Sequence, residues 1–429
     1  MKIRVVFALV LSLAGCAADE LRVPVPEAER ARELAFRQAP VVRTVTSEEF
    51  LAEEEAAGRG VSNEYVGFMH DTYGRLGFFP PEHDMRGVRG SQAALVAAYY
   101  SSTTKQITLI GSPKEPVVVH ELVHALQDEH FDLRGLYDQE LSSDERMAIR
   151  GLVEGDATMA EYRHEVWAEG GEPTTTLARQ ITANDARRFS ERVLDSVAGP
   201  AFFKAYPAFA YTFGAAFVAN RLRIASGRWS TSEVDDTFRA RPPSTTKEVL
   251  MGGATAFEPA PVGLAKLPPE LAASHEVETV DRLGAWYTYL LFHPLLPFGG
   301  FERVAPNWEG DQLVVLRERD LSIPPKQGRE RGVLWSSQWI MASAASEAGA
   351  TLQRVHGAVH VPESDADVYL TIRGENILIA VADRTVVFVA GFSPEVMRIL
   401  ARGVLETKEE KRLRIFNAYA ADPRVPCLR

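Results

Sequence analysis

The sequence predicts an α+β fold, with a mainly helical core, a β-hairpin in front of the central helix of that core, and a C-terminal α+β region. Three observations predict it. Residues 117–128 split into an apolar and a polar face when they are wound as a helix. Residues 93–100 and 106–110 are apolar or β-branched runs on either side of a polar turn, which is typical of a hairpin. After residue 308, short apolar runs typical of strands alternate with helical segments.

Composition limits the classes of partner. The 429 residues are enough for two or three domains, and 46% of them are apolar while 24% are charged, as in ordinary globular proteins. The formal net charge is -11 and no basic block occurs, so we expect no nucleic acid partner. Cys16 and Cys427 are the only cysteines, which excludes a disulfide framework and a cysteine-rich zinc site.

The first residues form a targeting segment. A basic start and an apolar run over residues 5–13 are followed by Leu-Ala-Gly-Cys at residues 13–16. This ending resembles the lipobox of bacterial lipoproteins, which implies removal of residues 1–15 as a signal peptide and a lipid on Cys16. The alternatives are an uncleaved membrane anchor and a plain secretory signal. Residues 17 and 18 are alanines, so no aspartate directly follows the cysteine, and this is similar to the pattern that sorts lipoproteins to the outer membrane, facing the periplasm.

The remaining chain divides into an N-terminal tether and helical segment at residues 16–60, a core domain at 61–305 and the α+β region at 306–429. The first part contains an extended Val-Pro-Val-Pro tether at residues 23–26, and a helix follows the cap at Thr46. Further helices are predicted at residues 61–78, 144–167, 176–226 (interrupted near Gly199 and Pro207), 275–293, 342–355 and 394–405. Strands are predicted at residues 313–316, 332–340, 368–372, 377–381 and 386–389, with a hairpin tip at Asp383.

The helix over residues 117–128 contains one H-E-x-x-H motif, in which two histidines on one helix face hold a zinc ion. His120, Glu121 and His124 share the polar face with Gln127 and Asp128. We therefore predict that His120 and His124 bind Zn²⁺ and that Glu121 acts on its water; the alternative is a chance match. Gln127 and Asp128 could orient a ligand histidine, since a metal-bound imidazole usually donates its second N–H.

Two histidines leave a catalytic zinc one protein ligand short, and a downstream Glu, His, Asp or Cys could supply it. The cysteines are poor choices, because Cys16 carries the expected lipid and Cys427 lies in a polar tail. His130 lacks the glycine turn that precedes the third histidine of metzincins. Glu154 is the best choice, and Glu161 on the same predicted helix is the next. The alternative for Glu154 is an ion-paired glutamate without a ligand role.

Residues 152–157, together with Glu161, resemble the E-G-x-A stretch of the gluzincins, the H-E-x-x-H…Glu metallopeptidases that include thermolysin and aminopeptidase N. The resemblance implies a zincin-like metallopeptidase core at residues 61–305 with Glu154 as the third zinc ligand. Two departures stand out. The 29 residues at 125–153 between His124 and Glu154 exceed the spacing in aminopeptidase N, and Thr158 stands where thermolysin-like enzymes carry an aspartate. Asp156 is a weaker choice for the role of that aspartate.

A narrower resemblance covers most of residues 60–340. Four stretches recur together in a group of little-characterised bacterial and archaeal proteins that are regarded as gluzincin-like metallopeptidases and are often lipoproteins. These stretches are residues 120–128, 152–157, 241–246 and 308–311. The resemblance supports the same fold and implies little about the substrate.

The predicted function is a zinc-dependent metallopeptidase of the bacterial cell envelope that hydrolyses a peptide or protein substrate, with Glu121 as general base. The hairpin edge beside the motif would present an extended substrate to the metal. Tyr211 and His164 are candidate donors to the oxyanion, although each also fits a structural role. Two alternatives remain open: a catalytically silent zincin-fold lipoprotein that binds or scaffolds, and a lipoprotein without a metal.

Overall fold

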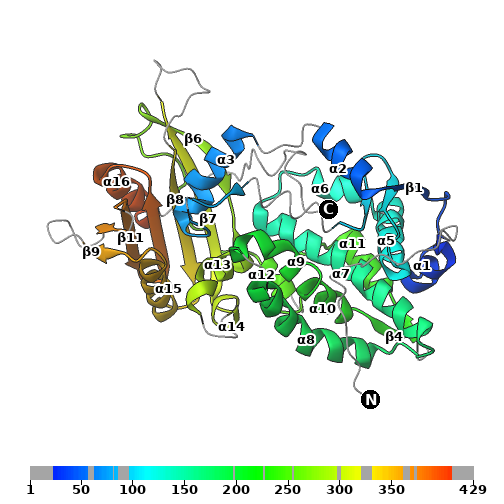
Figure 1. The fold of residues 1–429 in the computed structure, drawn as a ribbon. Coiled ribbons are helices and arrows are strands. Elements are labelled where there is room, and N and C mark those ends of the chain that lie inside the picture. The colour runs from blue at the N-terminus through cyan, green and yellow to red at the C-terminus, as the bar shows by residue number, and fades with distance from the viewer. Residues whose placement is uncertain are drawn as a thin grey trace.

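The computed structural model describes residues 23–56, 62–80, 82–85, 96–196, 199–225, 228–253, 256–296, 301–319, 331–360, 368–371 and 374–407 (Figure 1). The predicted signal peptide, Cys16 and Cys427 lie outside these ranges. Within them, every helix is too short or too polar to cross a lipid bilayer.

The predicted α+β fold is confirmed, and its first part is mostly helical with a small sheet. The predicted hairpin is present as β2 (Ala98–Ser101) and β3 (Gln106–Ile110). A third strand that the sequence did not predict, β1 (Val41–Val45), pairs in parallel with β3, so the strand order is β1-β3-β2. The strand β2 therefore forms one edge of this sheet.

The segment predicted as an extended tether is helical in its second half: residues 23 and 24 precede the helix α1 (Val25–Arg32), and residues 25 and 26 are its first two residues. Proline in the first helical turn lacks an N–H that would have no partner there in any case, so Pro26 fits the start of α1. Ala28, Ala31 and Arg32 of α1 are buried, and this helix packs against α5 and α7. The helix predicted after Thr46 is confirmed as α2 (Ser47–Ala56).

The helical part is built around two long helices, α5 (Glu115–Phe131) and α7 (Ser143–Ala168), which pack against each other (Figure 1). On its other side α7 packs against α10, where a Cβ added at Gly155 would lie 2.2 Å from the carbonyl carbon of Gly214. Around this pair lie the remaining elements: α3 (Asn63–Met69), η1 (His70–Gly74), α6 (Leu133–Tyr137), α8 (Thr175–Ser196), η2 (Ala201–Lys204), α9 (Ala205–Phe209), α10 (Phe213–Ala219), β4 (Arg223–Ala225), β5 (Arg228–Ser230), α11 (Ser232–Ala240) and α12 (Thr246–Leu250).

The second part is an antiparallel sheet of seven strands in the order β6-β7-β8-β12-β11-β10-β9. Its strands are β6 (His275–Asp281), β7 (Trp308–Glu318), β8 (Arg331–Trp339), β9 (Val359–His360), β10 (Val368–Leu370), β11 (Asn376–Ala382) and β12 (Thr385–Ala390). Alternate strand residues enter different cores: Leu313 and Val315 join the core of the helical part, whereas Val314 and Leu316 pack with α16. The sheet is therefore buried on both faces.

Four helices accompany the sheet: α13 (Gly284–Phe292), α14 (Phe301–Val304), α15 (Ala342–Val355) and α16 (Pro394–Leu405). The last two have the predicted limits. The prediction of a helix over residues 275–293 is wrong in its first half, because residues 275–281 form β6 and pair with β7. The edge strand β6 lies before residue 306, so the sheet includes residues that the sequence analysis placed in the core domain.

Candidate metal centre

Helix α5 is fixed by its apolar back. Leu122 and Leu126 are fully buried in a core that also contains Ile107 and Leu109 of β3, as the two-faced pattern predicted. The opposite face, with His120 and the rest of the motif, is covered by α7 and is also buried. The sequence pattern thus sets the direction of the motif side chains, and the packing of α7 closes over them.

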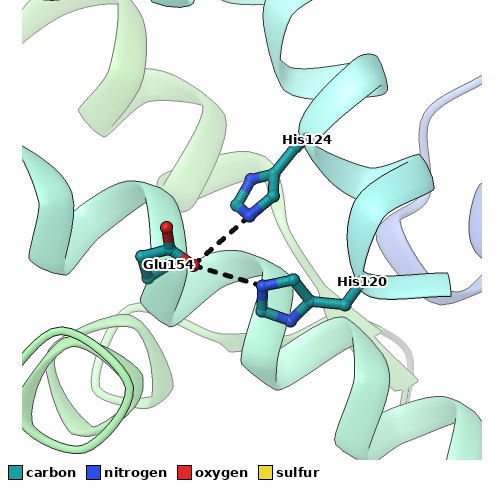
Figure 2. A group of neighbouring side chains, drawn as sticks. All are labelled: His120, His124 and Glu154. Atoms are coloured by element: carbon teal, nitrogen blue, oxygen red, sulfur yellow. Dashed lines mark hydrogen bonds and ion pairs between the residues drawn. The ribbon is translucent and has the colours of Figure 1, made fainter. Parts of the chain in front are cut away.

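The three predicted metal ligands meet between α5 and α7 (Figure 2). His120 Nε2 lies 3.2 Å and His124 Nε2 lies 3.3 Å from the same oxygen, Glu154 Oε2. One potential ligand atom from each residue lies within 4.8 Å of the others, and the three side chains are only 8%, 10% and 12% exposed. Two imidazole nitrogens and one carboxylate oxygen are a donor set that suits zinc. The group could therefore hold a metal ion.

The charges of this group stabilise one another. Burial alone would raise the pKa of Glu154, but His124 and His120 outweigh it and hold that pKa well below its usual value. Burial would lower the pKa of His120, yet Glu154 and Glu161 raise it well above the usual value. Glu121 is different, because burial dominates and raises its pKa. A carboxyl with a raised pKa beside a metal site is suited to accept and release a proton.

Glu161 supplies an orienting contact that the sequence did not assign to it. Its Oε2 lies 3.1 Å from His120 Nδ1, and Nε2 of the same ring faces Glu154. Thr158, at the position where thermolysin-like enzymes carry aspartate, has a buried hydroxyl that makes no hydrogen bond in the described part of the chain. The contact to the first histidine therefore comes from a residue one turn further along α7. The spacing of seven residues from Glu154, two helical turns, is the only sequence signal for it.

Gln127 has the predicted role of orienting His124. His124 Nδ1 lies 2.8 Å from Gln127 Oε1, and Gln127 Nε2 donates to the Val153 carbonyl (2.9 Å) and to Asp156 Oδ2 (2.8 Å). Because these two acceptors fix the amide orientation, Oε1 accepts the proton from His124 Nδ1 and leaves Nε2 for a metal. Asp156 thus acts on a ligand only through Gln127, and it is held by buried Arg32 at 2.7 Å.

Asp128 does not contact a ligand histidine among the described contacts. It accepts hydrogen bonds from Tyr100 Oη at 2.6 Å, Lys105 Nζ at 2.7 Å and the Leu133 N–H at 3.1 Å. Asp128 therefore ties the C-terminal turn of α5 to the hairpin and to the start of α6.

The two candidate oxyanion donors lie in different places. The ring centre of Tyr211 is 5.9 Å from that of His120. Burial raises the pKa of the Tyr211 hydroxyl, and Tyr206 and Glu154 are close enough to shift it as well. His164 instead pairs with Glu115 Oε1 at 3.1 Å, near the start of α5. Tyr206 was not found from the sequence, yet its hydroxyl donates to Glu154 Oε1. It comes from the short helix α9, which no motif or spacing relates to the metal site.

The comparisons with known proteins match only the C-terminal part. Residues 274–400 match a family described as a domain of unknown function, DUF8575. This range begins one residue before β6 and ends within α16, so it covers the seven-stranded sheet. Neither a curated protein nor a solved structure matches the chain.

Proposed function

We propose that this protein is a zinc-dependent metallopeptidase of the bacterial cell envelope. The observation that carries the proposal is the convergence of His120, His124 and Glu154, with Glu121 next to His120 on the same buried helix. Three protein ligands are typical of catalytic zinc, because they leave a fourth position for water or substrate. The fixed orientations of both histidines, through Glu161 and Gln127, are expected of a built metal site.

In the proposed hydrolysis, Glu121 transfers a proton and Tyr211 stabilises the oxyanion. A bound zinc would act as a Lewis acid and lower the pKa of its water to about 7. Glu121 takes a proton from the water as the water oxygen bonds to the peptide carbonyl carbon, and it passes that proton to the leaving nitrogen as the C–N bond breaks. Tyr211 is the better placed of the two oxyanion donors, since its ring lies beside His120.

The edge strand β2 supports a peptide as the substrate. Tyr100 of β2 directs its backbone N–H to the carboxylate of Glu121, so the edge that does not pair with β3 faces the site. An extended peptide that added to this edge would run past Glu121 and present its carbonyl to the metal. Fixed geometry of this kind is what hydrolysis of a main-chain amide requires.

The location in the envelope is proposed from the lipobox at the N-terminus. Cys16→Ala should give a soluble or unprocessed protein, because it removes the lipid attachment atom. Fractionation of cells that express the variant would test this. A variant that stays with the membranes at wild-type size would contradict the lipid anchor.

Substitution of the general base tests the activity. Glu121→Gln removes the carboxylate but keeps the size, and it should keep bound zinc while turnover of unfolded casein falls by about 10²–10⁴-fold. Glu115→Gln is the matched control, because Glu115 lies on the same helix with a 57% exposed side chain. A zinc-loaded wild type that never cleaves casein, or any other unstructured protein, would favour the silent binding or scaffold function instead.

A further inference from the structure

Two arginines precede Glu154 on α7 and have no carboxylate partner among the residues that the structure describes. Arg150 lies one turn and Arg146 two turns before Glu154. Arg146 Nη1 donates to the Tyr137 carbonyl at 3.4 Å, and its Nε is buried with no hydrogen-bond partner in the described part of the chain. In the described ranges, neither guanidinium lies within ion-pair distance of an acidic side chain. Both residues are half-buried.

Two carboxylates whose charges act on Arg146 are engaged elsewhere. Glu145 binds Ser142 in a capping box and lies 3.5 Å from Arg282. Asp281 accepts from the N–H and the hydroxyl of Ser143. Glu145 and Asp281 influence the pKa of Arg146 through their charge alone, without a hydrogen bond to it. The two guanidinium groups are therefore neighbouring like charges, and no described carboxylate forms an ion pair with either of them.

Tyrosines place the arginine pair beside the metal ligands. The Arg150 guanidinium lies 5.1 Å from the ring centre of Tyr206, whose hydroxyl donates to Glu154. The charges of Arg150, Glu154 and Arg146 all shift the pKa of the Tyr137 hydroxyl, so the three groups lie near the same tyrosine. Arg150 therefore occupies the same side of α7 as Glu154, near half-buried Tyr137 of α6 and buried Tyr206 of α9.

Unpaired, half-buried cations cost free energy unless an anion neutralises them in the working state. A guanidinium binds a carboxylate through two parallel hydrogen bonds and keeps its charge at any physiological pH. A peptide offers only two anionic groups of this kind, its C-terminal carboxylate and the side chains of aspartate and glutamate.

We propose that Arg146 and Arg150 bind a carboxylate of the peptide substrate beside the scissile bond. This inference rests on the proposed peptidase function. One helical turn rises about 5.4 Å, and an extended peptide advances about 3.3–3.6 Å per residue. The bound carboxylate therefore lies within about one to three residues of the bond that is cut. The enzyme would trim short C-terminal fragments or cleave near an acidic residue.

Three dansyl-labelled random decapeptide pools separate the two sources of the carboxylate. The first pool lacks Asp and Glu and has a free C-terminus, the second is the same pool with a C-terminal amide, and the third is amidated with one Glu at each position in turn. Preference for the first pool over the second identifies the C-terminal carboxylate. Preference for the third over the second identifies an acidic side chain, and the masses of products from the wild-type enzyme give its distance from the cut.

Binding is measured by fluorescence anisotropy on the zinc-loaded Glu121→Gln protein, so the result does not depend on turnover. The preferred pool should bind at least about tenfold more tightly than the second pool, as expected for hydrogen bonds to a charged group. Arg150→Gln and Arg146→Gln in that background should remove most of this difference, and Arg150→Lys should keep part of it. Arg134→Gln is the control, since its side chain is 61% exposed and pairs with Asp138.

Zinc content and melting temperature of each variant show whether the fold and the metal site persist, and Arg150→Lys tests the site if a neutral variant is unstable. Equal binding of all three pools, or a preference that Arg150→Gln and Arg146→Gln leave intact, would overturn the arginine proposal. Casein cleavage without a carboxylate preference would leave the peptidase function standing. A preference that needs the arginines, in a protein that cleaves nothing, would retain the carboxylate site and reject the peptidase.

Discussion

Two groups of buried ionisable side chains lie along α7, one near its middle and one at its start, and their contacts differ. The first is the metal centre, where His120, His124 and Glu154 converge. The second, which we call the aspartate joint, consists of Asp144, Asp281, Asp311 and Arg282, and it connects the start of α7 to the C-terminal sheet.

In the aspartate joint every carboxylate is saturated by donors. Asp144 accepts from the N–H and hydroxyl of Thr246 at 2.7 and 2.6 Å and from Arg282 Nε at 3.1 Å. Asp311 accepts from the N–H groups of residues 283 and 284, both at 2.7 Å, and from the Trp308 indole at 3.0 Å. These donors come from the two stretches at residues 241–246 and 308–311 that the sequence singled out, and from the turn before α13.

In the metal centre, potential ligand atoms point at one another instead. Two imidazole Nε2 atoms face one Glu154 oxygen, while the other nitrogen of each ring is already occupied by Glu161 or Gln127. The pKa values of the carboxylates in the two groups are shifted in opposite directions. Burial raises the pKa of Asp144, whereas the two histidines hold the pKa of Glu154 well below its usual value. Saturated carboxylates indicate a structural role, and converging ligand atoms indicate a site for a ligand.

The largest expected effect on stability comes from the aspartate joint. Asp144→Ala should lower the free energy of unfolding by about 3–5 kcal/mol, because it leaves Arg282 and Thr246 with buried, unpaired donors. Urea titration measures the loss. Asp138→Ala, which removes an exposed pair with Arg134, should cost about 1 kcal/mol or less. Equal effects of both variants, or zinc lost from folded Asp144→Ala protein, would erase the distinction between the two groups.

The back of α5 should also affect stability without affecting the metal. Leu126→Ala removes a fully buried side chain and should cost about 2–5 kcal/mol in unfolding free energy. Leu51→Ala, at a side chain that is 46% exposed, serves as the control and should have little effect. Zinc per folded chain should stay at the wild-type value. A loss below 1 kcal/mol in the same denaturation experiment would contradict the packing of α5 on the hairpin.

A smaller effect, on the metal alone, is expected at Glu161. Glu161→Gln weakens the acceptor of His120 Nδ1 and should reduce zinc affinity by about 10–100-fold, with little change in melting temperature of the metal-free protein. Competition with a fluorescent zinc chelator measures the affinity. Glu169→Gln, at the exposed C-cap of α7, also removes one carboxylate and should leave the affinity within a few-fold of wild type. Equal losses in both variants would mean that Glu161 acts only through its charge.

The sequence predicted what local pattern determines. The motif and the two-faced helix placed His120, Glu121 and His124, and α15 and α16 have the predicted limits because apolar spacing sets them. Residues 275–281 were assigned to a helix because their partners in β7 lie 32 (281 to 313) to 43 (275 to 318) residues further along the chain. The contacts of Tyr206 and Glu161 were missed for a related reason. They depend on how α9 and α5 approach α7, which no local pattern encodes.

The most direct test of the account is the zinc content of two glutamate variants. Wild type, Glu121→Gln and Glu154→Gln are loaded with zinc, dialysed against a weak chelator and analysed for zinc per chain, with His120→Ala as the metal-free reference. The proposal makes Glu154 a ligand and Glu121 a proton acceptor, so Glu121→Gln should retain zinc at the wild-type level. Glu154→Gln should lose most of it and regain part in excess metal. Full zinc in Glu154→Gln, or wild-type zinc in His120→Ala, would contradict the metal centre described for this protein.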